Sequence, residues 1–406
     1  MPYWLTERKW IALWAAFFGY MLDAMDVLLY VFAIQTLKTE FHMDNAMAGL
    51  ASSLTLILSA IGGIASGILS DRYGRRKLLI WSILIYSLAS GGTATSRTVA
   101  ELLFWRALVG IGLGAEWSAG ATLVAESWDP KNRAKALSLM QSGWAVGYML
   151  AAAITPYILE HYNWRVLFLV GLVPALFTVW VRRNVTEPEV WSKRTEEPGK
   201  FSTLFKPPYL SRTVRATVLA TSVLFAYWGL FTWLPGFLSA PASQGGAGLN
   251  IVKTSQWIFV MQFGTFLGYL TFGWLADKFG RRPAFAFYVV MAAILTFIYG
   301  MYPRWAGTGR EGWLLLIGPL VGFFGTGYFS LFGATLAELY PTSIRGAGQG
   351  FTYNFGRGLS ALAPFLVGAL ADRAGLGSAL LLNSAFFLLA AGLVFTLPET
   401  KDTTLT

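Results

Sequence analysis

Long apolar segments follow one another along this chain, separated by short polar stretches. Each is about 20 residues long, enough for an α-helix to cross a membrane, whereas the strands of a membrane barrel alternate over about ten residues. Only 13% of the residues are charged and 55% are hydrophobic, against roughly 25% charged in soluble domains. We therefore predict an all-α membrane protein with twelve transmembrane helices, near residues 10–35, 46–69, 77–96, 98–125, 134–157, 164–183, 213–240, 252–275, 283–302, 312–337, 346–370 and 376–397.

The basic residues are distributed unevenly between the segments that connect these spans. If the amino terminus is inside, 22 of the 31 Lys and Arg residues lie on the cytoplasmic side and 7 on the outer side, while Arg106 and Arg357 fall within spans. Basic loops stay in the cytoplasm. We therefore expect a multi-pass protein of the cell (inner) membrane with both termini cytoplasmic, and the net charge of +10 does not call for a nucleic-acid partner.

The chain repeats itself once. The stretch GILSDRYGRRK begins at Gly67 and GWLADKFGRRP at Gly273, 206 residues later, and Glu126 recurs as Glu338, 212 residues later. A polar stretch divides the two copies, so we predict an amino-terminal six-helix bundle (1–183), a cytoplasmic linker (184–212) and a carboxy-terminal six-helix bundle (213–406). Parallel repeats of this kind place a binding site between the two halves, near the middle of the membrane.

Three acids lie deep inside predicted spans: Asp23 and Asp26 in the first and Glu116 in the fourth. A carboxylate at this depth costs roughly 2.5–3.5 kcal/mol and therefore indicates a functional site. Asp23, Asp26 and Glu116 are candidates to take up and release a proton. The alternatives are packing or helix–helix hydrogen bonding for Asp23 and Glu116, and for Asp26 a structural ion pair with Arg106 at a similar depth.

Arg357 lies in the eleventh span, about 17 Å from its cytoplasmic end at 1.5 Å per residue, near the level of Asp23 and Glu116. A guanidinium binds a carboxylate with two parallel hydrogen bonds and stays charged, so Arg357 is predicted to bind an anionic substrate; otherwise it pairs with a carbonyl or an acid on a neighbouring helix. Further polar candidates for substrate binding, each of which could equally be a packing residue, are Asn354, Tyr328, Gln262, Tyr227, Gln141 and Tyr148.

The repeated glycine-containing loops lie at the predicted cytoplasmic helix ends. Their bases could merely follow the charge rule for cytoplasmic loops, but the glycines and acids are not explained that way, since an acid can bind the amino terminus of a facing helix. We assign a gating or ion-pair role to a group of charged residues at this end: Asp71, Arg72, Arg75, Asp277, Arg281, Glu126, Arg133, Glu338 and Arg345.

These motifs resemble those of the major facilitator superfamily over the full length of the chain. The resemblance rests on the doubled Gly-x-Leu/Ile-x-Asp-x-x-Gly-Arg-Arg loop, RALVGIGLG from Arg106, ELYPTSIRG from Glu338 and LPET from Leu397. Within the superfamily, three stretches are similar to the sialate:proton symporter branch: GYMLDAMDVLLY from Gly19, GAEWSAGATLVAESWDPKNRAKA from Gly114 and WRVLFLVGLVPALFTVWVRRNVTEPEVW from Trp164. The resemblance implies that acids of the first and fourth helices carry protons. It also implies that the loop motif latches the two halves on the cytoplasmic side in the outward-facing state.

The expected function is proton-coupled symport of a small organic anion by alternating access. A monocarboxylate such as lactate, pyruvate or sialate is the substrate that the resemblance favours. The alternatives are an antiporter that exports amphipathic compounds, or a symporter of an aromatic or sugar acid. The sequence has no cysteine and no ATP-binding or zinc-protease pattern, so we expect neither enzyme activity nor a cofactor or metal. The partners are then the substrate, a proton and the lipid bilayer, and a monomer is expected.

Overall fold

The computed structural model describes residues 7–128, 130–187, 201–306, 312–341 and 344–400. In this part of the chain all regular structure is helical. The helices are α1 (Arg8–Phe41), α2 (Asn45–Tyr73), α3 (Arg75–Thr93), α4 (Val99–Ser127), α5 (Pro130–His161), α6 (Trp164–Val170), α7 (Val173–Asn184), α9 (Tyr209–Ser239), α10 (Ile251–Phe279), α11 (Arg281–Ala306), α12 (Gly312–Thr326), α13 (Phe329–Glu338), α14 (Arg345–Ser360), α15 (Leu362–Ala374), α16 (Leu376–Ala379) and α17 (Leu381–Leu393), with short 3₁₀ turns η2 (Phe201–Phe205), η3 (Ala242–Gln244) and η4 (Val394–Thr396).

Helices occupy all twelve predicted spans, and the all-α prediction is confirmed. Ten of the helical stretches within the described ranges are long and apolar enough to cross a membrane. Four predicted spans are not single helices. The breaks fall between α6 and α7, α12 and α13, α14 and α15, and within the last span. Pro174 stands at the start of α7, where a missing N–H is tolerated, and Gly327 and Tyr328 form a turn between α12 and α13.

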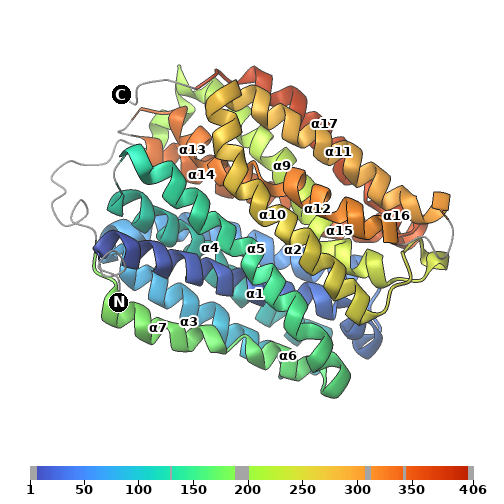
Figure 1. Cartoon of the computed structure of the whole chain (residues 1–406). Helices are drawn as coiled ribbons and strands as arrows, with labels where there is room; N and C mark the ends of the chain where they lie inside the picture. Colours follow the sequence, from blue (N-terminus) through green and yellow to red (C-terminus); the bar gives the residue numbers. More distant parts are fainter. Residues whose placement is uncertain (1–6, 129, 188–200, 307–311, 342–343, 401–406) are drawn as a thin grey trace.

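The helices of both halves lie side by side in one bundle. In Figure 1, α1–α7 (blue to green) fill one side and α9–α17 (yellow to red) the other. We call α1–α7 the amino-terminal half and α9–α17 the carboxy-terminal half. The halves meet where α5 packs against α10, and where α2 packs against α14 and α15. Large apolar side chains such as Trp81 and Leu176 are 62% and 73% exposed on the outside, as expected of surfaces that face lipid.

Local signals in the sequence set several helix boundaries. Thr98 caps α4 by accepting a hydrogen bond from the backbone N–H of Glu101, and Asn163 and Asn250 cap α6 and α10 in the same way. Side-chain oxygens at these positions satisfy backbone donors that have no partner within the helix. Gly74 and Gly280 both have φ of +103° at the junctions α2/α3 and α10/α11, a backbone conformation that glycine adopts without steric cost.

α2 and α4 approach each other closely through glycines. A Cβ atom on Gly110 would lie 2.2 Å from the backbone oxygen of Thr55, and one on Gly114 would lie 1.7 Å from that of Ser59. Small residues allow helix backbones in a membrane to touch. The fourth span therefore uses its glycines for contact with α2, and this contact fixes the level of α4 side chains relative to those of α2.

The two halves are also joined by hydrogen bonds at the end of the bundle opposite to the start of α1, which we call the far end. The Asp372 carboxylate on α15 accepts hydrogen bonds from the backbone N–H groups of Asn45 (3.2 Å) and Ala46 (3.0 Å) and from the Asn45 side chain (2.6 Å). The backbone N–H of Phe365 donates to Ser53 Oγ at 3.2 Å. An acid of the carboxy-terminal half thus caps the first turn of α2 in the amino-terminal half.

Candidate functional site

A central cavity lies between the two halves. Its lining comes from α1, α2, α4 and α5 of the amino-terminal half and from α9, α10, α13 and α14 of the carboxy-terminal half. Three charged side chains of the described residues line it: Asp23, Arg106 and Arg357. With two cations and one acid, its charged lining favours an anion over a cation.

Arg357 reaches this cavity from α14 and is 6% exposed. Its Nη1 donates to Ser59 Oγ of the opposite half at 2.8 Å, and its guanidinium lies over the rings of Tyr353 (4.9 Å) and Trp117 (5.7 Å). Nε has no hydrogen-bond partner in the described structure. The aromatic rings hold the planar group, and its remaining donors suit a carboxylate.

Asp23 alone of the three predicted proton-carrying acids lines the cavity, and it is 2% exposed. Its Oδ1 has no hydrogen-bond partner among the described groups, and it interacts electrostatically with both Glu116 and Arg357. Glu116 is fully buried next to Gly19 of α1, where a Cβ would lie 2.5 Å from its Oε1. It does not line the cavity, but it lies near enough to Asp23 for the two carboxyl groups to interact.

Asp26 and Arg106 are both buried, and no hydrogen bond between them is found among the described residues, so the structural ion pair that was one alternative for Asp26 stays a prediction. Nε and Nη1 of Arg106 lack hydrogen-bond partners in the described part of the chain, and the carboxylate of Asp26 interacts with the hydroxyl of Ser90. The two groups interact electrostatically. Arg106 also stacks on the ring of Tyr30 at 4.8 Å, and it lines the cavity, which Asp26 does not.

Aromatic side chains form much of the cavity wall. Trp117 Nε1 donates to Gln141 Oε1 at 2.9 Å, and Trp144 Nε1 donates to the hydroxyl of Tyr227. These bonds fix the orientation of the two indole rings, and Trp117 also stacks on Tyr353 with the ring centroids 4.4 Å apart. The aromatic residues that line it are Tyr20, Tyr30, Trp117, Trp144, Tyr227, Trp228, Tyr269, Phe329 and Tyr353.

Of the seven residues predicted to bind substrate, Arg357, Tyr227 and Gln141 line the cavity and four do not. Asn354 donates to the backbone oxygen of Gly350 and packs against Gly63 of α2. Tyr148 donates to the backbone oxygen of Phe231 at 3.1 Å. Tyr328 and Gln262 are buried away from the cavity. Whether a side chain lines the cavity depends on how its helix is rotated about its own axis. The depth of the residue along the span does not determine this rotation.

Several lining residues were not predicted from the sequence. Ser52, Thr55 and Ser59 are spaced three and four residues apart on α2 and present their hydroxyls on one face. This spacing is the signal that could have identified them, because residues at i, i+3 and i+7 share a helix face. Tyr353, one turn before Arg357 on α14, carries the same kind of signal.

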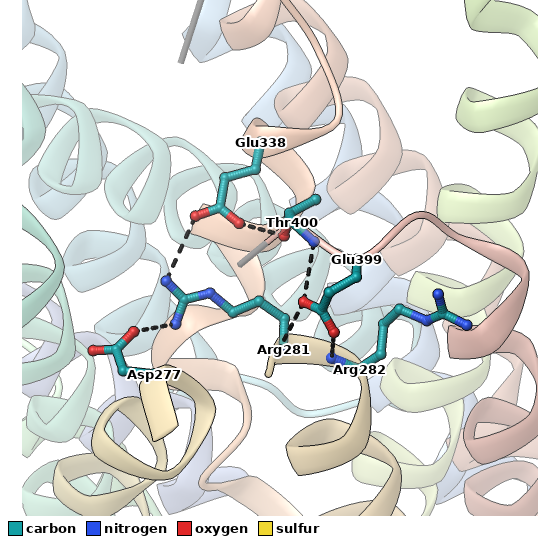
Figure 2. Close-up of polar contacts among 6 residues, drawn as sticks. All are labelled: Asp277, Arg281, Arg282, Glu338, Glu399 and Thr400. Carbon is teal, nitrogen blue, oxygen red and sulfur yellow. Dashed lines mark hydrogen bonds and ion pairs between the residues drawn. The ribbon is translucent and has the colours of Figure 1, made fainter. Parts of the chain in front are cut away.

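The charged loop motif of the carboxy-terminal half forms a compact cluster at the end of the bundle where α11 begins (Figure 2). Arg281 contacts Asp277 at 2.7 Å and Glu338 at 3.8 Å. Glu338 also accepts a hydrogen bond from Thr400. Burial raises the pKa of the Glu338 carboxyl above its ordinary value, and the Thr400 hydrogen bond and the Arg281 guanidinium partly oppose this effect.

Both repeats share a further contact that the loop motif does not contain. Glu399 accepts the backbone N–H groups of Arg281 (2.9 Å) and Arg282 (3.1 Å), which caps α11. The equivalent acid, Glu187, accepts those of Arg75 (2.9 Å) and Arg76 (3.2 Å), which caps α3. The acids that bind helix amino termini here are thus glutamates that follow the last helix of each half, 212 residues apart.

The cluster of the amino-terminal half has the same form. Arg75 contacts Glu126 at 3.0 Å, as Arg281 contacts Glu338. Each of these ion pairs lies within one half, so the latch between halves stays a prediction. The side chains of Asp71, Arg72, Arg133 and Arg345 lie outside the described structure.

Comparison with known proteins identifies the family. The model of the Major Facilitator Superfamily matches residues 16–242 and 242–406. The chain therefore belongs to this superfamily, and it is a membrane transporter and not an enzyme. A D-xylose-proton symporter of known structure covers 98% of this chain and 100% of its own at a TM-score of 0.76 and 20% identity. This likeness shows the shared twelve-helix fold.

Several curated relatives match over nearly their whole length. A relative from Haemophilus influenzae, described as a metabolite transport protein, is 33% identical over 409 residues, 98% of each chain. The sialic acid transporter NanX of Escherichia coli K12 is 29% identical, covering 94% of this chain and 91% of its own. The cis,cis-muconate transport protein of Acinetobacter baylyi is also 29% identical, with 95% and 93% covered.

Proposed function

We propose that this protein is a proton-coupled symporter of a small organic anion, with Arg357 as the carboxylate-binding group and Asp23 as the proton-binding group. One observation carries the proposal: the two side chains share one cavity between the halves. Relatives that transport sialic acid and cis,cis-muconate support an organic acid as substrate. Residues 1–183 and 213–406 would act as the two moving bundles, joined by the linker 184–212. Both termini would lie in the cytoplasm of a monomer in the inner membrane.

The coupling has a simple electrostatic basis. An ionised Asp23 would repel a substrate carboxylate held by Arg357 in the same cavity. A proton on Asp23 removes this repulsion, so anion and proton favour each other's binding. An unpaired charge in a closed apolar site is costly, so the halves would rearrange readily when both ligands are bound or both are absent.

Export of amphipathic compounds is the competing function, and the aromatic cavity wall favours it. The two guanidiniums of the cavity, Arg106 and Arg357, would repel a cationic drug. To decide, we would reconstitute the protein in liposomes and measure uptake of radiolabelled lactate, sialate and cis,cis-muconate with and without an inward proton gradient. We expect at least one of these acids to accumulate only with the gradient. Uptake of none of them, or uptake indifferent to the gradient, would reject the symport proposal.

Alternating access requires the far-end contact of Asp372 with α2 to open. We expect Asp372→Asn to weaken it, because a carboxylate at a helix amino terminus contributes about 0.3–2 kcal/mol, and to shift the protein toward the state open at the far end. The chain has no cysteine, so Val31→Cys, which lines the central cavity and a neighbouring far-end cavity, supplies a single thiol. Its labelling by a membrane-impermeant maleimide should be faster in the Asp372→Asn background.

Asp44→Asn is the matched control for this measurement. Asp44 accepts a hydrogen bond from the backbone N–H of Met47, within its own half, so its loss removes a nearby charge without touching the contact between halves. Equal labelling rates in the Asp372→Asn and unchanged backgrounds would show that the contact does not hold the far end closed. If Asp44→Asn accelerates labelling as much as Asp372→Asn does, the contact between the halves is likewise not what holds the far end closed.

A further inference from the structure

The cavity contains a second guanidinium that the proposed carboxylate site does not use. Arg106 is 1% exposed and lines the same cavity as Arg357. Its Nε and Nη1, like the hydroxyl of Ser52 in the same lining, have no hydrogen-bond partner in the described part of the chain. A buried cation with unsatisfied donors is costly unless it is paired. These groups all require an acceptor.

The level of the two guanidiniums can be read from α2. Arg357 donates to Ser59. The backbone oxygen of Arg106 accepts from Thr55 Oγ1 at 3.0 Å, and its guanidinium stacks on Tyr30, whose hydroxyl donates to the backbone oxygen of Ala48 at 2.8 Å. The Arg106 guanidinium therefore lies toward the start of α2, between the levels of Thr55 and Ala48. The level of the Arg106 guanidinium is therefore roughly 6–16 Å from that of Ser59 along the axis of α2, at 1.5 Å per residue.

We propose that the cavity selects a dicarboxylate, with one carboxylate on Arg357 and the other on Arg106. This inference rests on the proposed function and extends it from a monocarboxylate, the class that the family resemblance favours, to an acid with anionic groups at both ends. A guanidinium is the side chain best suited to bind a carboxylate with two hydrogen bonds. The aromatic side chains that line the same cavity as the two arginines suit a flat, unsaturated chain of about six carbons.

Two other charged groups bear on this assignment. Asp26 on α1 interacts electrostatically with Arg106 and also interacts with the hydroxyl of Ser90, but it does not line the cavity. Asp23 lines the cavity with both arginines, so a dianion would bind when Asp23 carries a proton. The competing view makes Arg106 a structural partner of Asp26 with no contact to substrate.

The experiment compares two ligands that differ only at the far carboxylate. trans,trans-Muconate and sorbate share a rigid six-carbon diene, and sorbate has a methyl group in place of the second carboxylate. Their dissociation constants would be measured by calorimetry on the purified full-length protein. We expect muconate to bind about 10- to 100-fold more tightly, the range for a charge-assisted hydrogen-bonded contact. Arg106→Gln should remove this preference while changing sorbate binding less than about twofold.

The ratio of the two affinities within each variant is the decisive quantity, because a general loss of stability changes both ligands alike. Arg106→Lys keeps the charge and should keep part of the preference. Equal binding of both ligands to the unaltered protein would overturn the inference, as would a parallel loss of both in Arg106→Gln. Binding of neither would overturn it as well. The proposed function would survive each result if proton-driven uptake of lactate or sialate is observed.

Discussion

Replacing Arg357 with glutamine should abolish high-affinity substrate binding. The substitution removes the cation that Trp117 and Tyr353 stack against and the hydrogen bond to Ser59, and it leaves the carboxylate without a charged partner. Hydrogen bonds to charged groups contribute about 1.5–3 kcal/mol each, so we expect the dissociation constant to rise at least ~10- to 100-fold. Calorimetry with the acid taken up best among lactate, sialate and cis,cis-muconate would measure it.

Two companion variants make this result specific. Arg357→Lys keeps the positive charge but loses the planar fork, and it should bind with intermediate affinity. Arg373→Gln changes the same charge at an exposed site on α15 and should bind like the unaltered protein. An unchanged dissociation constant in folded Arg357→Gln would remove Arg357 from the site.

Replacing Asp23 with asparagine should separate substrate movement from proton movement. Asparagine is permanently neutral and therefore imitates the protonated side chain, so the substrate carboxylate meets no repulsion. In liposomes with an inward proton gradient, we expect the accumulation ratio of the same acid to fall to about one, whereas exchange of external labelled against internal unlabelled substrate should continue.

Glu116→Gln and Asp26→Asn are the matched comparisons, because both remove a buried acid that does not line the cavity. They should reduce accumulation less than Asp23→Asn does. Undiminished uphill accumulation in Asp23→Asn would exclude it as the coupling acid. Loss of binding with proton coupling intact would assign it to the substrate site instead.

The sequence predicted the number and limits of the spans well, because the length and apolarity of a membrane helix are dictated by the bilayer. It did not predict the breaks within four spans. The breaks occur at turns such as Gly327–Tyr328 and near prolines such as Pro174. Glycine and proline also occur inside unbroken helices, so their presence alone does not predict a break. Pro303, for example, lies within α11.

The candidate site was predicted only in part. Charged residues inside apolar spans stand out, and Asp23, Arg106 and Arg357 all line the cavity. Depth along a span does not give the direction in which a side chain points. Asp26 and Arg106 lie at similar depth and interact electrostatically, but only Arg106 lines the cavity. Among the neutral candidates, Tyr148 and Gln262 do not line it. The glutamate caps on α3 and α11 escaped because Glu187 and Glu399 are far in sequence from the helices that they cap.

The backbone contact between α2 and α4 has a mechanical consequence. Because Gly110 and Gly114 leave no space between these helices, Arg106 and the α2 hydroxyls would move together under the proposed alternating access, while Arg357 would move with the carboxy-terminal half. A dianion bound by both arginines would then connect the two moving halves. Its length would govern the turnover rate, and a rigid dianion slightly too long for the closed state would act as an inhibitor.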